Sequence, residues 1–247
     1  MRTILKVDHL FKDFSGLEVL AGVSIEIREG ERHAVIGPNG SGKTTLFNII
    51  TGLYRPSHGR IYFFDKDISG WPAHRIARTG ISRSFQVINV FPKMTVYENV
   101  RSAVVSKFNR RFNWVSLLDR DKPIEEETFR IIELLSLTDV SDVPAFELSY
   151  GKQRHLELAL TMSREPVLIM LDEPTAGLNS EETKGAIQLI RRLTEGKTLL
   201  LVEHDMDVVF NLADRVTVLG YGTILATGTP DEIQAHEEVK KAYLGRK

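Results

Sequence analysis

Apolar and polar positions divide the chain into short strand-like runs and longer helical stretches. Between residues 3 and 30 the apolar residues come in short runs, and the alternation over residues 19–27 before Glu29-Gly30 predicts antiparallel strands and a turn. Residues 31–36 form a predicted buried strand, and the apolar runs at 166–171 and 198–202 are typical of parallel strands buried on both faces. Further strands are expected over 60–64 and 81–86, with a hairpin over 215–226.

Helices are predicted between these strands from capping residues and helical spacing. They cover residues 43–50 and 73–78, and others begin at the capping boxes 95–98 and 229–232, at Pro123 and at Ser180. The helix after Pro123 is expected to bury Phe129, Ile131, Ile132, Leu134 and Leu135. Ser180 is expected to cap the next helix, which should bury Ala186, Ile187, Ile190 and Leu193 and end at Gly196. Residues 106–122 read as a solvated surface segment.

The alternation of buried strands and helices predicts a right-handed α/β core with a parallel sheet. An N-terminal antiparallel β subdomain precedes this core, and a helical stretch is inserted between two of its strands. Ligands bind at the carboxyl ends of the strands in such a sheet, so side chains that follow the strands are expected to converge there.

Composition narrows the classes of function. The 247 residues suffice for one large domain or a core with a subdomain, and 42% hydrophobic and 26% charged residues are ordinary for a soluble globular protein. The net charge of −1 argues against bulk nucleic-acid or membrane-surface binding, and the absence of cysteine excludes disulfides and thiolate metal sites. No apolar run approaches the roughly 18 residues that span a bilayer, and the charged N-terminus is unlike a signal peptide. We therefore expect a cytosolic chain that reaches a membrane only through a partner.

Residues 37–44 fit the phosphate-binding pattern G-x-x-x-x-G-K-[ST]. Glycines allow the backbone to approach a ligand, and the following helix directs its N-terminal N–H groups at the phosphates. Lys43 would reach the β- and γ-phosphates, and the Thr44 hydroxyl would bind Mg²⁺. A glycine-rich turn that binds nothing is the alternative, but the strand before the loop and the helix after it favour a nucleotide site.

Acidic and polar residues follow the other core strands. Asp172 ends an apolar strand and can hold Mg²⁺ beside Thr44, and Glu173 can polarise an attacking water. Ordinary loop charges are the alternative, but a buried strand that ends in two acids needs a partner such as a metal. Gln86 and His204 also stand at predicted strand ends. Phe14, from spacing alone, is better explained as a core aromatic.

The order of these motifs resembles the ATP-binding subunit of ABC transporters over the whole chain. Residues 37–45 are similar to Walker A, Gln86 to the Q-loop, residues 148–153 to the signature motif, residues 167–174 to Walker B, residues 176–179 to the D-loop and His204 to the H-loop. The resemblance implies a P-loop NTPase fold. It also implies a core formed by residues 1–86 and 159–247, and a helical subdomain at 87–158 that carries the signature motif.

The resemblance also implies roles for individual residues. Glu173 would be the general base, with His204, Lys43 and Gln86 as further catalytic residues. Phe14 would stack on adenine, and Ser149 and Gly151 would contact the γ-phosphate of ATP held by a second subunit. The remaining nucleotide contacts would come from the phosphate loop: Asn39, Gly40, Ser41, Gly42, Lys43, Thr44 and Thr45. Magnesium would be bound by Thr44, Gln86 and Asp172.

The chain departs from the family pattern at two positions. Tyr150 stands where glycine is commonest in the signature motif, and Asn179 stands where aspartate is usual in the D-loop. Asparagine keeps the hydrogen bonding and loses the charge, which puts communication between the two sites in doubt.

Within the family, the chain is most similar to the branched-chain amino acid uptake group, on residues 80–86, 91–100, 148–157, 228–233 and 242–245. The implied partners are permease subunits, a second ATP-binding subunit and a solute-binding protein, with the chain peripheral on the cytoplasmic face of the membrane. Residues 87–94 would form part of a groove for a helix of the permease. Alternatives are the motor of a lipid or lipopolysaccharide exporter, a soluble ABC machine on ribosomes or DNA, and a nucleotide sensor without turnover.

Overall fold

The computed structural model describes residues 2–84, 89–107 and 122–244, with side chains through residue 241. Its contacts divide the chain into two compact units. The first unit comprises Met1–Arg83, Val167–Thr175 and Gly185–Lys247, and the second comprises Ser84–Pro166 and Ala176–Lys184. The sequence places the helical part at residues 87–158, whereas the second unit is longer at both ends and includes part of the segment after Walker B.

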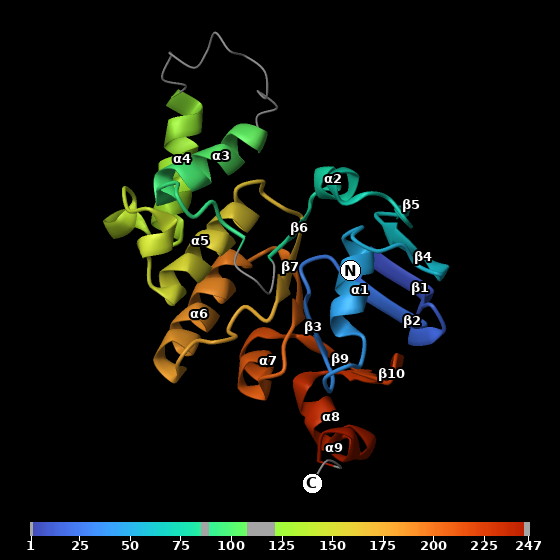
Figure 1. The fold of residues 1–247 in the computed structure, drawn as a ribbon. Helices are drawn as coiled ribbons and strands as arrows, with labels where there is room; N and C mark the ends of the chain where they lie inside the picture. The colour runs from blue at the N-terminus through green and yellow to red at the C-terminus, as the bar shows by residue number, and fades with distance from the viewer. Residues whose placement is uncertain (1, 85–88, 108–121, 245–247) are drawn as a thin grey trace. The chain divides into compact units, whose positions relative to one another are not determined.

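The first unit holds an antiparallel sheet, which we name the small sheet, in the strand order β2-β1-β4-β5 (Figure 1). These strands are β1 (Thr3–Phe14), β2 (Leu17–Arg28), β4 (His58–Phe63) and β5 (Lys66–Asp67). The predicted antiparallel pairing is confirmed, but β1 and β2 are longer than the apolar runs indicated, because their outer face is polar and exposed.

The same unit holds the large sheet, in the strand order β10-β9-β3-β8-β7-β6. Its parallel strands are β3 (Arg32–Ile36), β6 (Ile81–Arg83), β7 (Leu168–Asp172), β8 (Thr198–Val202) and β9 (Arg215–Gly220). The last strand, β10 (Thr223–Gly228), pairs with β9 as the predicted antiparallel hairpin. Every residue of β7 and β8 is buried, as the apolar runs predicted.

Helix α1 (Lys43–Ile50) packs between the two sheets. Its side chains Leu46, Phe47, Ile49 and Ile50 belong to one apolar cluster with residues of β1, β2, β4, β3, β7 and β8. Burial of these side chains fixes the helix that follows the phosphate loop, and therefore fixes the loop itself.

Shorter helices complete the first unit. They are α2 (Ala73–Ile76) with the 3₁₀ turn η1 (Ala77–Thr79), α7 (Met206–Leu212), α8 (Pro230–Ala235) and α9 (Glu237–Leu244). Thr229 and Glu232 form the predicted capping box of α8. Helix α6 (Ser180–Leu193) begins in the second unit and continues in the first. Its buried residues are Ala186, Leu189, Ile190 and Leu193, so the prediction of Ile187 in place of Leu189 was wrong.

The second unit is largely helical. It contains α3 (Val96–Lys107), α4 (Lys122–Leu134) and α5 (Tyr150–Met162), with the 3₁₀ turns η3 (Thr138–Val140) and η4 (Ala145–Glu147). The capping box at Thr95 and Glu98 is confirmed, with both reciprocal hydrogen bonds present. Phe129 was expected to be buried but is 48% exposed, because Thr128 occupies the buried helical position and the Phe129 ring packs on Tyr97 instead.

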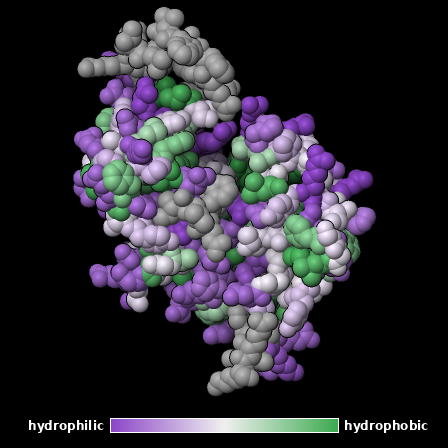
Figure 2. All heavy atoms as spheres, in the orientation of Figure 1, coloured by the Kyte–Doolittle hydropathy of each residue, from purple (hydrophilic) through white to green (hydrophobic). Residues whose placement is uncertain are grey.

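Polar and apolar residues are interspersed on the face of the molecule drawn in Figure 2. Among the described residues, no helix is long and apolar enough to cross a membrane.

Candidate nucleotide site

The phosphate loop joins β3 to α1 with backbone conformations that require glycine. Gly40 and Gly42 have φ values of 78° and 102°, a region that residues with a Cβ rarely adopt. A Cβ on Gly37 would clash with the carbonyl oxygen of Leu219 and with Ser41 Oγ. The fold therefore favours glycine at each of these positions. The predicted helix Lys43–Ile50 starts immediately after the loop.

Lys43 folds back over the loop. Its Nζ donates hydrogen bonds to the carbonyl oxygens of Gly37 (2.8 Å) and Pro38 (3.1 Å). Burial lowers the pKa of Lys43, while the negative charges of Glu173 and Asp172 act in the opposite direction. The lysine therefore places a positive charge in the loop and within the electrostatic reach of both Walker B carboxylates.

The loop residues present a polar cradle. The Ser41 hydroxyl is buried and has no hydrogen-bond partner among the described residues. Asn39, Gly40 and Thr44 are exposed beside it, at the N-terminal end of α1. An orphaned hydroxyl in a glycine cradle at a helix N-terminus fits a phosphate group, which supplies the missing acceptor.

Asp172 ends the buried strand β7, and its carboxylate has a cationic partner. Arg83, the last residue of β6, donates from Nη2 to Asp172 Oδ2 at 2.7 Å. The guanidinium also donates from Nη1 to Asn48 Oδ1 (2.7 Å) and to Thr51 Oγ1 (3.1 Å). A metal was the expected partner of this buried acid, and Arg83 is a partner that the sequence pattern did not indicate. The sequence feature that could have indicated this pair is the charge of Arg83, which stands in a strand that pairs with the apolar strand β7.

Glu173 follows directly in a left-handed backbone conformation, with φ of 49°. Its N–H donates to the carbonyl oxygen of Val202 at 2.9 Å, which anchors the turn on β8. The carboxylate is 20% exposed, and its Oε1 lies 3.9 Å from Nδ1 of His204, whose side chain is 59% exposed. A strained residue at a strand end costs of order 1 kcal/mol, and here it places a half-buried carboxylate beside a histidine.

Glu203 follows directly after β8, and its carboxylate contacts both Thr175 and the His204 N–H. It is fully buried, and its Oε1 accepts hydrogen bonds from Thr175 Oγ1 (2.6 Å) and Thr175 N (3.3 Å). Burial raises the pKa of Glu203, while the hydrogen bonds from Thr175 and from the His204 N–H act against that rise. No sequence pattern pointed to Glu203, because Thr175 lies 28 positions away in the chain and meets it only in the fold.

The residues predicted to contact the adenine base and the second nucleotide lie far apart in the chain. Phe14 is 39% exposed, so the core-aromatic alternative was wrong; its ring meets Tyr54 edge-on, with ring centroids 5.4 Å apart. In the second unit, Ser149 caps α5, with Oγ accepting from the Lys152 N–H at 3.4 Å, and Gly151 lies in the first turn. The helix begins at Tyr150. Gln86 lies outside the described residues.

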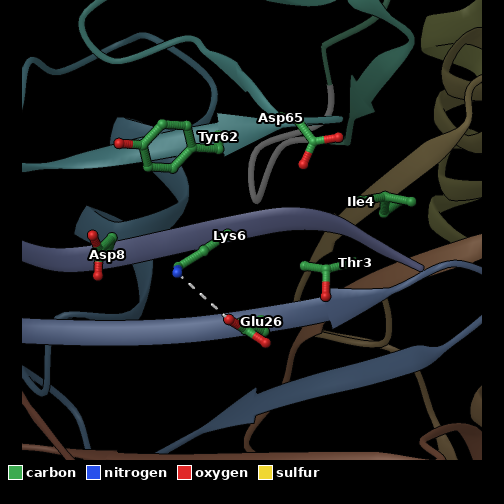
Figure 3. Close-up of a pocket in the computed structure, with 7 residues that line it drawn as sticks. All are labelled: Thr3, Ile4, Lys6, Asp8, Glu26, Tyr62 and Asp65. Atoms are coloured by element: carbon green, nitrogen blue, oxygen red, sulfur yellow. Dashed lines mark ion pairs between the residues drawn. The ribbon is translucent and has the colours of Figure 1, made fainter. Parts of the chain in front are cut away.

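A separate depression on the small sheet contains none of the predicted site residues. Figure 3 shows it lined by Thr3, Ile4, Lys6, Asp8, Glu26, Tyr62 and Asp65. Lys6 of β1 and Glu26 of β2 approach to 3.8 Å across it, with both side chains about half exposed. A solvent-exposed pair of this kind contributes little stability, and we regard the depression as ordinary sheet surface.

Comparison with known proteins agrees with this geometry. The family profile described as ABC transporter matches residues 20–176. The chain belongs to the ABC transporter family. It is an ATP-binding cassette of that family, whose members are the ATPases of transporters. A second profile, described as branched-chain amino acid ATP-binding cassette transporter, matches residues 223–247.

Individual ABC proteins match over nearly their whole length. The high-affinity branched-chain amino acid transport ATP-binding protein BraF of Pseudomonas aeruginosa is 39% identical over 251 residues, which cover 99% of this chain and 98% of BraF. The ADP conformation of MJ1267, an ATP-binding cassette of an ABC transporter, has a TM-score of 0.86 at 31% identity and covers 100% of both chains. A dimeric post-hydrolysis state of the cassette MJ0796, bound to ADP and Pi, has a TM-score of 0.79 at 25% identity and covers 92% of this chain and 99% of that one.

Proposed function

We propose that the chain is the ATP-hydrolysing subunit of an import-type ABC transporter for branched-chain amino acids or related small polar solutes. One observation carries the hydrolytic part: Glu173 is held in a left-handed turn beside buried Asp172, on the same unit as Lys43 and the orphaned Ser41 hydroxyl. The solute is supported by the full-length similarity to BraF and by the profile match at residues 223–247.

In this proposal the residues of the phosphate loop hold the triphosphate of ATP. Lys43 exchanges its bonds to the Gly37 and Pro38 carbonyls for bonds to the β- and γ-phosphates, and Ser41 donates its hydroxyl to a phosphate oxygen. Phe14 stacks on the adenine. Mg²⁺, held by Thr44, Asp172 and Gln86, would neutralise charge on the phosphates. Glu173 accepts a proton from the attacking water, and His204 contacts the γ-phosphate.

The second unit carries the residues that we propose contact the partners of this chain. Ser149 and Gly151 contact ATP bound to a second cassette, so that two chains close around two nucleotides. The loop before α3 is a docking element for a permease helix: Phe91 is 57% exposed, and Asn99 holds its backbone through bonds to the Phe91 N–H (2.8 Å) and carbonyl (3.0 Å). Residues 87 and 88 of the proposed groove lie outside the described residues. Attachment through a permease would place the chain on the cytoplasmic face of the membrane, with a solute-binding protein completing the importer.

The test is a gentle detergent pull-down of the tagged Glu173→Gln chain with ATP, with the recovered proteins identified by mass. Two membrane proteins, with or without a second ATPase, are the expected result. Recovery of the chain alone, or with ribosomes or nucleic acid, would remove the transporter function and leave the ATPase. A Lys43→Ala chain in parallel controls for nucleotide-dependent assembly, because it should bind ATP poorly.

A further inference from the structure

Tyr150, in the signature motif, reaches across to the segment that follows Walker B. Its hydroxyl donates a hydrogen bond to the carbonyl oxygen of Ala176 at 3.1 Å. The same hydroxyl accepts a hydrogen bond from Nη2 of Arg154 at 2.9 Å. Donation and acceptance together orient the phenol group, and each bond polarises the other.

The Tyr150 ring also covers the backbone of the next residue, Gly177. Gly177 has φ of 79°, and a Cβ there would lie 3.2–3.4 Å from two ring carbons and the hydroxyl oxygen of Tyr150. Arg154 is a rigid support for this ring, because it is 5% exposed and its Nη1 donates to Glu157 Oε2 at 3.0 Å. The tyrosine therefore joins the first turn of α5 to residues 176 and 177 through both its hydroxyl and its ring.

The far end of the same loop is also held near α5. Asn179 caps α6, with Oδ1 accepting from the N–H groups of Glu181 and Glu182 at 3.0 Å each. Glu182 accepts from the Asn179 N–H at 2.9 Å, and its Oε1 would lie 3.4 Å from a Cβ on Gly151. The prediction that Ser180 caps this helix was wrong, since Ser180 is its first residue. Asparagine caps a helix as well as aspartate does, which explains how the uncharged residue is tolerated here.

The division of the chain agrees with these contacts. Residues 167–175 belong to the first unit, and residues 176–184 belong to the second unit together with α5. On the first-unit side of this boundary, Thr175 is bound through its hydroxyl and its N–H to buried Glu203. On the second-unit side, the Ala176 carbonyl is bound to Tyr150. The peptide bond between residues 175 and 176 thus has an anchor on each side.

We propose that Tyr150 is a positioning residue that fastens the 176–179 loop to the signature helix α5. When nucleotide binds at Ser149 and Gly151, the loop moves with the helix, and the displacement reaches Glu173 through Thr175 and Pro174. Tyr150 itself does not touch the nucleotide. The inference rests on the proposed function, in which Ser149 and Gly151 contact ATP of a second subunit.

The experiment compares the purified full-length chain with its Tyr150→Phe variant, which keeps the ring and removes the hydroxyl. Hydrogen–deuterium exchange is expected to be faster in a peptide covering residues 176–183 and unchanged over residues 198–204. Steady-state ATP hydrolysis is expected to show a kcat about 2- to 10-fold lower and a KM for ATP within about twofold, because the variant loses the hydrogen bond that fastens the Ala176 carbonyl, together with the one from Arg154. Tyr221→Phe is the matched control, since it removes a hydroxyl from an exposed ring in the other unit and should change neither readout.

Unchanged exchange over 176–183, or an unchanged kcat, would overturn the role of Tyr150. A rise in KM without a fall in kcat would also overturn it, because that pattern indicates a direct contact with the nucleotide. Failure of the proposed function has a different signature: the wild-type chain itself would not hydrolyse ATP, and Glu173→Gln would not dimerise with ATP in analytical ultracentrifugation.

Discussion

Both ends of the large sheet pair their buried charges, and the carboxyl end also carries a buried hydroxyl that has no partner among the described residues. Near the amino ends of β3 and β9, His33 Nδ1 lies 2.7 Å from Glu31 Oε1 and His33 Nε2 lies 2.8 Å from Thr217 Oγ1. Arg32 pairs with Asp214 at 2.9 Å in the same region. At the carboxyl ends, the Ser41 hydroxyl has no partner among the described residues, and Glu173 stands 3.9 Å from His204 in a strained turn.

This difference distinguishes polar groups that stabilise the fold from polar groups that remain available to a ligand. Where the groups satisfy one another at short range, the polar network contributes to specificity of the fold and leaves no capacity for a ligand. Where a hydroxyl is orphaned and a carboxylate in a strained turn lies 3.9 Å from a histidine, groups remain that can bind and react. His33 is therefore a satisfied core histidine, in contrast to His204.

The largest expected effect tests the reactive end directly. Glu173→Gln should lower ATP turnover by about 10²–10⁴-fold and leave ATP affinity unchanged, because the amide cannot accept the proton of the attacking water. Phosphate release and equilibrium ATP binding measure the two quantities. Glu195→Gln, an exposed carboxylate distant from the site in the chain, is the matched control. Turnover near the wild-type rate in Glu173→Gln would refute the assignment of the general base.

Loss of the Arg83 side chain should have the next largest effect, this time on stability. Arg83→Met leaves the carboxylate of Asp172 buried without this guanidinium, and we expect the free energy of unfolding to fall by about 3–5 kcal/mol. Urea unfolding at neutral pH measures it. The double variant Arg83→Met with Asp172→Asn should recover much of the loss, because the buried charge is gone. Equal loss in single and double variants would contradict the pairing, and Arg78→Met on the exposed η1 turn is the control.

Lys43→Ala should weaken ATP binding by about 10- to 100-fold, since a charge-assisted hydrogen bond to phosphate is worth roughly 1.5–3 kcal/mol. Isothermal titration with ATP and Mg²⁺ measures the change. Lys184→Ala, which removes an exposed lysine of α6, should bind ATP as the wild-type chain does. Unchanged affinity in Lys43→Ala would count against the phosphate loop.

The smallest expected effect is a difference in pH dependence between two carboxyl groups, Glu31 at one end of the sheet and Glu203 at the other. Burial would raise the pKa of Glu31, but hydrogen bonds from His33 and the Arg28 N–H outweigh it and lower that pKa below 4.5. The ionised Glu31 thus stabilises the fold above pH 4.5, and this contribution is lost as the pH falls through the folded-state pKa. The pKa of Glu203 is raised above 4.5, so its contribution is present below pH 4.5 and is lost as the pH rises through its folded-state pKa.

Urea unfolding between about pH 3.5 and 8 on Glu31→Gln and Glu203→Gln measures both contributions. The difference in unfolding free energy between wild type and Glu31→Gln should shrink below pH 4.5 and stay constant above it. For Glu203→Gln, the unfolding free energy of the wild type relative to the variant should fall as the pH rises above 4.5. Matching pH dependences in the two variants would show that the ends of the sheet do not differ in this way.

Local and periodic signals predicted most of the fold. The helix at residues 43–50, the strand at 198–202, the hairpin around Tyr221 and both capping boxes follow from short-range rules, because the residues that decide them are neighbours in sequence. Errors arose where a tertiary neighbour decided the outcome. The Phe129 ring packs on Tyr97 at the surface, and Asn179 rather than Ser180 caps α6 because Glu182 completes the box.

The sequence by itself determined the chemistry available to this ABC cassette: a glycine loop with Lys43 and Thr44, two carboxylates after a buried strand, and a histidine after the next one. These are properties of residue type and spacing, and short-range backbone physics suffices to read them. Only the tertiary structure decided what those groups meet. The pairing of Arg83 with Asp172, of Thr175 with Glu203 and of Tyr150 with Ala176 joins residues 89, 28 and 26 positions apart. Such partners are selected by how strands and helices pack, and no local pattern encodes that choice.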